Sequence, residues 1–146
     1  MNNKILITGV AGFIGFHLAE SLLKDGFNIV GIDNLNDYYD VNLKKDRLKK
    51  IIDNKNFVFE ECDISDRDSL NKIFKIYKPT KVVNLAAQAG VRYSLENPYA
   101  YMNSNLVGFL NVIEQCRHND VQGLIYASSS SVYGGNTKVP FDVKDQ

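Results

Sequence analysis

The sequence predicts an α/β fold, a doubly wound parallel sheet with helices on both of its faces. Three observations point to it: short apolar, β-branched runs recur along the chain, helically spaced segments separate them, and a glycine-rich turn follows the first run. Strands that alternate with helices form parallel sheets through right-handed crossovers. The chain has 146 residues, which suits one domain with a sizeable core.

The first strand, helix and second strand are expected near the amino terminus. Residues 5–7 form a continuously apolar run of the kind found in strands that are buried on both faces. A helix from Phe13 to about Asp25 is predicted by the helical spacing of its apolar residues, which are Ile14, Leu18, Leu22 and Leu23. Gly26 is predicted to end this helix, and residues 28–32 to form a second buried strand.

The alternation continues along the rest of the chain. Further helices are expected over residues 39–53, 66–77 and 99–117, and further strands over residues 57–62, 81–86 and 123–128. Asp66 or Ser65 is expected to cap the helix over 66–77. The sequence contains no repeats, low-complexity tracts or linkers. Because ligands of such sheets bind outside the carboxyl ends of the strands, functional residues are expected at those ends.

Three glycines, Gly9, Gly12 and Gly15, follow the first strand with the spacing expected for a dinucleotide pyrophosphate site. The first glycine allows a tight turn, the second lets the phosphates approach the backbone, and the third lets the helix pack against the strand. The unpaired N–H groups and the positive dipole end of the helix then face the anion. A tight connection that binds no nucleotide is the alternative interpretation.

Asp33 lies at the carboxyl end of the second predicted strand. A carboxylate in this position accepts hydrogen bonds from the adenosine ribose hydroxyls and repels a 2′-phosphate. Residues 34–37 contain no Arg or Lys that could bind that phosphate. The expected cofactor is therefore NAD rather than NADP.

The charge composition argues against some classes of partner. Lys and Arg number 17, as do Asp and Glu, so no basic field predicts binding to nucleic acid or to an anionic membrane. One basic cluster is interleaved with apolar residues and is interpreted as the solvated face of an amphipathic helix. Its members are Lys44, Lys45, Arg47, Lys49 and Lys50.

The cysteines and histidines do not predict a metal site. Cys62 and Cys116 are isolated, without metal-ligand spacing, and are interpreted as reduced thiols. His17 and His118 have no partner in motif register, so a role as ligand or general base is not expected. No apolar run approaches the length of a signal or transmembrane segment, and a cytoplasmic protein is expected.

Several short motifs lie at the predicted strand ends and on the last predicted helix. They are residues 8–15 (TGVAGFIG), 33–34 (DN), 63–64 (DI), 85–88 (LAAQ), 105–108 (NLVG) and 128–134 (SSSSVYG). Together they resemble the extended short-chain dehydrogenase/reductase family, and within it the nucleotide-sugar epimerases and dehydratases. Residues 86–94 (AAQAGVRYS) and 37–40 (DYYD) are most similar to UDP-glucuronate 4-epimerases of the capsular polysaccharide type.

The resemblance implies a Rossmann fold that binds NAD. Phe13 and Ile14 would present backbone N–H groups to the pyrophosphate, and Asp63 would accept from the adenine amino group unless it only caps a turn. Asn105 would make a structural or cofactor-side contact unless it faces solvent. The full set of implied cofactor residues is Gly9, Gly12, Phe13, Ile14, Gly15, Asp33, Asn34, Asp63, Ile64, Leu85, Ala86, Ala87 and Asn105.

The serine run suggests the chemistry. Ser129 occupies the family's Ser/Thr position, where a hydroxyl steers the proton that leaves the sugar C4 hydroxyl. Ser130 and Ser131 stand where dehydratases of the family place an acidic pair. Epimerisation through a 4-keto intermediate, between UDP-glucuronate and UDP-galacturonate, is therefore preferred to dehydration. Gln88 and Arg92, together with Ser130 and Ser131, are the expected substrate residues, although Gln88 and Arg92 could equally be solvated loop residues.

One part of the family pattern is missing from the chain. The family's Tyr-x-x-x-Lys acid/base pair is expected roughly two dozen residues beyond Ser129. The sequence contains this spacing only at Tyr77 and Lys81, where Pro79 prevents the two side chains from sharing a helix face. Residues 1–146 are therefore expected to be an incomplete NAD-binding domain, without the substrate domain and inactive alone.

Two alternative functions remain open, and one oligomeric state is expected. The alternatives are a nucleotide-sugar 4,6-dehydratase or reductase, and a catalytically silent NAD-binding module. The family resemblance implies that the longer protein could form a homodimer through the helix over 99–117.

Overall fold

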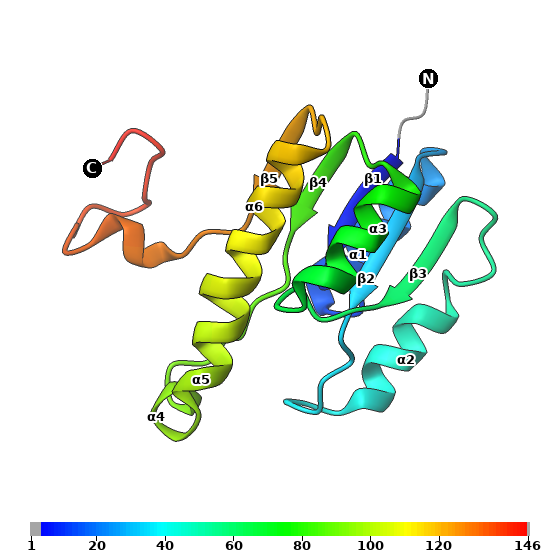
Figure 1. Ribbon diagram of the computed structural model, residues 1–146. Helices are drawn as coiled ribbons and strands as arrows, with labels where there is room; N and C mark the ends of the chain where they lie inside the picture. Colours follow the sequence, from blue (N-terminus) through cyan, green and yellow to red (C-terminus); the bar gives the residue numbers. More distant parts are fainter. Residues whose placement is uncertain (1–3, 146) are drawn as a thin grey trace.

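The computed structural model describes residues 4–145 and contains a five-stranded parallel sheet (Figure 1). The strands are β1 (Lys4–Thr8), β2 (Asn28–Asp33), β3 (Phe57–Glu61), β4 (Lys81–Asn84) and β5 (Gly123–Tyr126). Their order across the sheet is β3-β2-β1-β4-β5. The predicted doubly wound fold is confirmed. The strand order reverses between β1 and β4, and such a reversal opens a crevice at the carboxyl ends of the strands.

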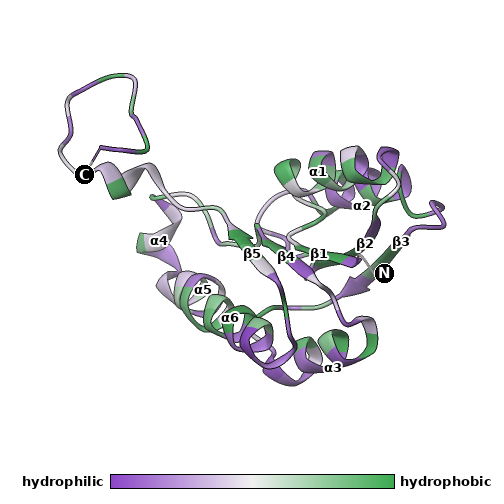
Figure 2. Cartoon of the chain, turned by 90° about the horizontal axis from the view of Figure 1, so that it is seen from above, coloured by the Kyte–Doolittle hydropathy of each residue, from purple (hydrophilic) through white to green (hydrophobic). Residues whose placement is uncertain are grey.

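Helices cover both faces of the sheet (Figure 2). On one face lie α1 (Phe13–Lys24) and α2 (Val41–Lys49), and on the other α3 (Arg67–Tyr77) and α6 (Phe109–His118). Each face has its own apolar core, in which Ile7 of β1 packs with α1, and Leu6 of β1 packs with α3 and α6. The two neighbouring side chains of β1 thus supply both cores, which explains why the strand is apolar at consecutive positions.

The helix predicted over 99–117 is interrupted. It consists of α5 (Pro98–Tyr101), a π-helical stretch η1 (Met102–Gly108) and α6. At Gly108 a Cβ atom would lie 2.6 Å from Cγ1 of Ile64, so only glycine allows this approach to the loop after β3. Two short elements were not predicted: α4 (Tyr93–Glu96) and the 3₁₀ helix η2 (Ser130–Tyr133). Both are shorter than the window over which apolar periodicity can be recognised.

Helix ends mostly follow the local signals. Gly26, with φ of +82°, ends α1, and its N–H donates to the carbonyl of Leu23. Asp66 caps α3 by accepting from the N–H groups of Asp68 and Ser69. The helix predicted over 39–53 is shorter at both ends, because Asp40 caps α2 immediately before Val41 and α2 ends at Lys49.

The misleading Tyr-x-x-x-Lys spacing falls across two elements, as predicted. Tyr77 ends α3, Lys78 adopts a left-handed conformation with φ of 47°, and Lys81 begins β4. The Tyr77 hydroxyl donates to Glu60. Within residues 4–145, no helix is long and apolar enough to cross a membrane.

Candidate functional site

Two neighbouring cavities lie at the carboxyl ends of the strands and share the segment 85–88 after β4. The first is bordered by the glycine turn and by the ends of β2 and β3. Of the residues expected to bind a cofactor or substrate, it is lined by Gly9, Gly12, Asp33, Asn34, Asp63, Ile64, Leu85, Ala86, Ala87 and Gln88. The second, of about 650 Å³, lies between the ends of β4 and β5 and includes Asn105 and Ser129. The structure thus brings most of the predicted residues to one edge of the sheet.

Each glycine of the turn meets a different constraint. Gly9 has φ of +68°, and a Cβ there would lie 2.8 Å from the backbone nitrogen of Ala86. A Cβ on Gly15 would overlap the carbonyl oxygen of Gly9, so this glycine allows α1 to pack against the turn. A Cβ on Gly12 would meet only that same oxygen, at 3.0 Å. Gly12 otherwise borders open space in the first cavity, as a phosphate cradle requires.

The start of α1 is open to an anion. Gly12 is the N-cap, and no side chain of the described residues caps the helix or adds an acid to its first turn. The first intrahelical bond runs from the N–H of Phe16 to the carbonyl of Gly12, so the preceding N–H groups have no partner within the helix. The residues Phe13 and Ile14 at this helix start are 66% and 64% exposed. The N–H groups at the start of α1 that have no partner within the helix, together with the helix dipole, favour a negative charge at this point.

Asp33 connects the end of β2 to the glycine turn. One carboxylate oxygen accepts from the N–H of Ala11 at 3.1 Å, and the other accepts from the N–H of Leu35 at 2.9 Å. The residue is only 7% exposed, yet it lines the first cavity. Because each carboxylate oxygen can accept more than one hydrogen bond, Asp33 retains capacity for a ligand hydroxyl.

Asn34 and Asp63 form a second polar pair on the cavity wall. The Asn34 amide donates to one oxygen of Asp63 at 2.8 Å, and the N–H and hydroxyl of Ser65 donate to the other at 2.8 and 2.7 Å. Burial on its own would raise the pKa of Asp63, but these hydrogen bonds outweigh it and hold the pKa below its ordinary value. Asp63 therefore stays ionised and does cap the turn before α3.

Thr8 and Asn84, at the ends of the paired strands β1 and β4, were not predicted as site residues. The fully buried Thr8 hydroxyl donates to the Asn84 side-chain oxygen at 2.7 Å. It also accepts from the N–H groups of Leu85 and Ala86 at 3.0 and 2.9 Å. One threonine thus shapes the segment shared by both cavities. The sequence did contain a signal for Thr8 and for Asn84, because each is a polar residue at the end of an apolar run.

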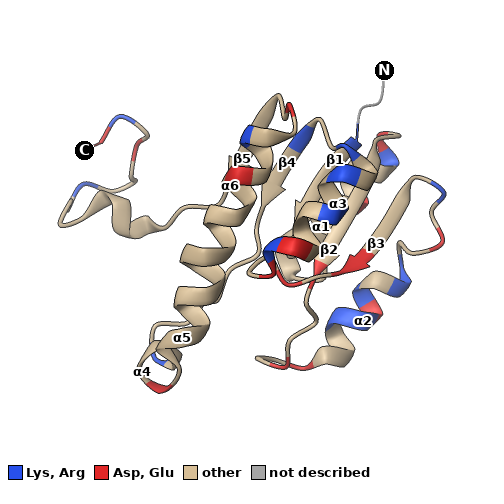
Figure 3. Ribbon diagram, viewed as in Figure 1, with Lys and Arg blue, Asp and Glu red and all other residues tan. Residues whose placement is uncertain are grey.

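The expectation for the basic cluster was partly wrong. Lys45 and Lys49 on α2 and Lys50 directly after it are exposed, as predicted, but Lys44 is only 4% exposed and lines the first cavity. Arg47 is half-buried and donates to the carbonyl of Ala11 at 3.1 Å. α2 lies beside the carboxyl ends of β2 and β3, and several blue Lys and Arg segments lie along it (Figure 3). Lys44 therefore points into the cavity, and Arg47 points toward the glycine turn, rather than toward solvent.

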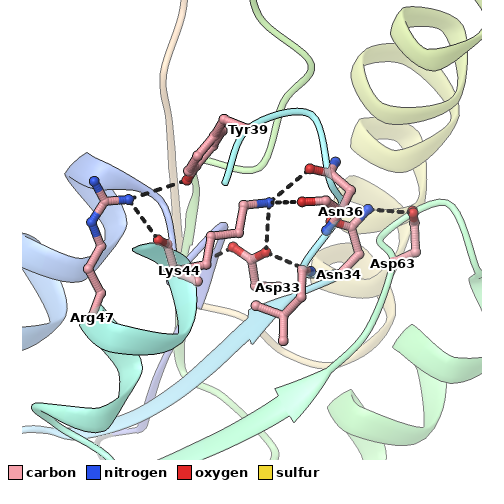
Figure 4. A network of polar contacts seen from close by, with 9 residues as sticks. Asp33, Asn34, Asn36, Tyr39, Lys44, Arg47 and Asp63 are labelled. Atoms are coloured by element: carbon pink, nitrogen blue, oxygen red, sulfur yellow. Dashed lines mark hydrogen bonds and ion pairs between the residues drawn. The ribbon is translucent and has the colours of Figure 1, made fainter. Parts of the chain in front are cut away.

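Lys44 also changes the argument about cofactor preference. Its Nζ donates to the backbone and side-chain oxygens of Asn36 at 3.0 and 2.8 Å, and lies 3.7 Å from the Asp33 carboxylate (Figure 4). Residues 34–37 do lack a basic side chain, but α2 supplies one from outside that segment. The absence of Arg and Lys from residues 34–37 therefore does not leave Asp33 without a nearby cation, and the preference for NAD depends on Asp33 itself.

Asn105 holds the segment after β4 in place. Its side-chain oxygen accepts from the N–H of Gln88 at 2.8 Å, and its amide donates to the Gln88 carbonyl at 3.0 Å. The Asn105 amide is thus bound to the backbone of Gln88, although the residue as a whole is exposed. Gln88 is buried and lines both cavities, so it is not a solvated loop residue. Arg92, in contrast, is exposed before α4 and lies outside the residues that line either cavity.

The serine run occupies the edge of the second cavity. Ser129 lines it, and its hydroxyl accepts from the N–H of Ser131 at 3.2 Å and donates to the Ser131 hydroxyl at 3.1 Å. These contacts cap η2. Ser130 and Ser131 are exposed and lie outside the lining residues.

Both cysteines are free, and Cys62 lines the first cavity. Burial, together with the negative charges of Asp66, Asp63 and Glu60, raises the pKa of Cys62 to about 11. Burial also raises the pKa of Cys116 to about 11. Both thiols are therefore protonated at neutral pH and weakly reactive. Residues 4–145 contain no group of three or more His, Cys, Asp or Glu arranged to hold a metal ion.

Comparisons with known proteins identify the family. The family model described as GDP-mannose 4,6 dehydratase matches residues 6–146, and the chain belongs to this family. Protein CapI of Staphylococcus aureus is 58% identical over 97% of this chain and 42% of its own length. UDP-glucuronate 4-epimerase 4 of Arabidopsis thaliana is 48% identical over 97% of this chain and 32% of its own.

A solved structure agrees with these sequence matches. UDP-glucuronic acid 4-epimerase from Bacillus cereus, crystallised with UDP-glucuronic acid and NAD, superposes with a TM-score of 0.83 and 36% identity. The match covers 92% of this chain and 43% of that one. The chain thus spans about two fifths of the length of the Staphylococcus relative and of this epimerase, and about a third of the Arabidopsis one. The resemblance to nucleotide-sugar epimerases and dehydratases is confirmed.

Proposed function

We propose that this chain forms the NAD-binding part of a nucleotide-sugar 4-epimerase that interconverts UDP-glucuronate and UDP-galacturonate. The observation that carries the proposal is the uncapped start of α1, which borders the same edge of the sheet as the buried Asp33 carboxylate. An anion site and a hydroxyl acceptor in this arrangement match the pyrophosphate and ribose of a dinucleotide. The similarity to UDP-glucuronate 4-epimerases supports the choice of sugar.

Different residues of the first cavity would bind different parts of the cofactor. The open space at Gly12 and the N–H groups of Phe13 and Ile14 would hold the pyrophosphate, and Asp33 the adenosine ribose. Asp63 is ionised and can accept from the adenine amino group, while Ile64, Ala86 and Ala87 provide apolar contact. When bound, NAD would accept a hydride from the sugar C4 carbon and return it.

The second cavity would hold the sugar. Its volume of about 650 Å³ is in the range of small-molecule sites. Ser129 lines this cavity and offers a hydroxyl that can orient the proton of the C4 hydroxyl. Gln88 is buried, lines both cavities and would contact the nucleotide sugar. The exposed Arg92 would serve a uronate carboxylate only if the bound sugar extends beyond the cavity.

The serine run supports epimerisation over dehydration. Dehydration removes water across C5 and C6 and needs an acid and a base at the sugar. Ser130 and Ser131 provide neither at neutral pH. The name of the matching family model keeps a 4,6-dehydratase as the second candidate, and the products of the reaction distinguish the two.

The test is product analysis with the protein that contains this chain. It is incubated with UDP-glucuronate, and the nucleotide sugars are separated by chromatography. UDP-galacturonate is the expected product, and Ser129→Ala should lower turnover by roughly 10²–10⁴ with NAD affinity unchanged. Ser130→Ala is the matched control and should have little effect, because Ser130, although expected from the sequence to contact the substrate, is exposed and lines neither cavity. A 4-keto-6-deoxy product would indicate a dehydratase, and tight NAD binding without any product would indicate a silent module.

A further inference from the structure

We propose that the first cavity contains a latent 2′-phosphate site in which Lys44 supplies the cation, so that Asp33 alone excludes NADP. This inference rests on the proposed function, because it assumes that the adenosine ribose binds at Asp33. It goes beyond that function by assigning a specificity role to a buried lysine on α2. It also predicts that one substitution at Asp33 changes which cofactor is preferred.

The geometry of the Lys44 ammonium leaves one donor for a ligand. An ammonium group has three N–H donors, and Lys44 uses two of them on the backbone and side-chain oxygens of Asn36. The Asp33 carboxylate lies 3.7 Å away, which is close enough for an ion pair but too long for a hydrogen bond. Figure 4 shows the ammonium between Asn36 and Asp33.

The position of this ammonium is fixed by its surroundings. The side chain is only 5% exposed, and its Nζ lies 4.8 Å from the centre of the Tyr39 ring. A turn of Lys44 toward solvent would break both hydrogen bonds to Asn36 and the contact with the Tyr39 ring. Lys44 nevertheless lines the cavity together with Asp33. A ligand in this cavity can therefore contact both the remaining N–H donor of Lys44 and the Asp33 carboxylate.

The charges at this point decide between the two cofactors. A ribose hydroxyl that donates to the Asp33 oxygen facing Lys44 would lie at most about 7 Å from the ammonium, because that oxygen is 3.7 Å from Nζ. A phosphate on that hydroxyl would be attracted by the ammonium and repelled by the carboxylate, so the two effects oppose each other. Removing the carboxylate charge leaves the positive charge unopposed in a largely buried site. The cation for a 2′-phosphate is then already in place.

A purely structural role for Lys44 makes a different prediction. If Lys44 only holds the loop through Asn36, its removal should weaken NAD and NADP equally, whatever residue stands at position 33. If it forms the latent phosphate site, its removal should act on NADP selectively, and only when Asp33 has been neutralised. A double-mutant cycle separates these two roles.

The experiment is calorimetric titration of the chain with NAD and with NADP. The proteins are the unmodified chain, Asp33→Asn, Lys44→Gln, the double variant, and Lys45→Gln as the matched control, since Lys45 is exposed on the same helix. Asp33→Asn should bind NADP about tenfold or more tightly than the unmodified chain does. Adding Lys44→Gln should abolish this gain while changing NAD affinity less than about threefold, and Lys45→Gln should have no effect on the gain.

A second measurement covers the case in which Lys44→Gln does not fold. In Asp33→Asn, adenosine 2′,5′-bisphosphate should bind at least tenfold more tightly than adenosine 5′-monophosphate, and Lys44→Arg should preserve this difference because it keeps the charge. The inference would be overturned if Asp33→Asn does not bind NADP more tightly than the unmodified chain, or if the gain in NADP affinity persists without Lys44. In either case, NAD binding by the unmodified chain would still support the cofactor assignment. Failure of the unmodified chain to bind NAD would overturn the cofactor assignment and the inference together.

Discussion

The Thr8 hydroxyl offers a direct test of how the site is built, through the substitution Thr8→Val. Valine has nearly the shape of threonine, so the packing of the buried side chain is retained while the hydroxyl is lost. The hydroxyl makes three hydrogen bonds, to the Asn84 side chain and to the N–H groups of Leu85 and Ala86. Thr8→Val therefore removes the polar link between β1, β4 and the segment that both cavities share.

The expected loss of stability follows from these contacts. Among the described residues, every buried side-chain nitrogen and oxygen has a hydrogen-bond partner, so the substitution creates a new unpaired group at Asn84. Net hydrogen-bond contributions of about 1 kcal/mol each give a loss of about 3 kcal/mol. For a domain of this size that corresponds to a fall in melting temperature of roughly 6–12 °C. The affinity for NAD should fall as well, because residues 85–88 lose their support.

Thr8→Ser is the matched control, and both variants are compared by thermal unfolding and by titration with NAD. Serine keeps the hydroxyl and removes one buried methyl group, which contributes about 1 kcal/mol. Thr8→Val should therefore be clearly less stable than Thr8→Ser and should bind NAD more weakly. If the two variants lose the same stability, or if the serine variant is the less stable, the hydroxyl does not organise the site.

Three further predictions concern other parts of the chain. Gly12→Val should abolish NAD binding in titrations while circular dichroism shows a folded domain, because the branched side chain occupies the proposed phosphate space; unchanged affinity would make the glycine turn a simple connection. NAD should slow alkylation of Cys62, which lines the cavity, and leave the slow reaction of Cys116 on α6 unchanged, as peptide mass spectrometry can measure; equal protection of both thiols would contradict the location of the site. The hydrogen bond to Glu60, together with burial and the Glu60 charge, raises the pKa of Tyr77 to about 12, so the folded chain keeps a proton that the unfolded chain releases above pH 10. Stability should therefore fall between about pH 10 and 12 more steeply in the unmodified chain than in Tyr77→Phe, and identical pH profiles would argue against this hydrogen bond.

Local patterns in the sequence determined the fold class and the first half of the site. Apolar runs and helical spacing identified the five strands and the main helices, because each pattern is contained within a few consecutive residues. Gly9, Gly15 and Asp33 could be assigned for a similar reason, since a positive φ, a close helix approach and a strand-end carboxylate are local requirements. The π-helical stretch was not predicted, because apolar spacing alone does not distinguish its wider turns from an α-helix.

Only the tertiary structure decided which distant side chains meet. Lys44 belongs to a cluster that local reasoning assigns to solvent, and it is buried because α2 folds back beside β2. Thr8 and Asn84 are 76 residues apart and become neighbours because β4 pairs with β1. The sequence by itself determined the local conformations that bring the chain to this edge of the sheet. The ion pair at Asp33 and the hydrogen bonds at Thr8 were decided by strand order and helix packing, because such contacts depend on distances that no local pattern records.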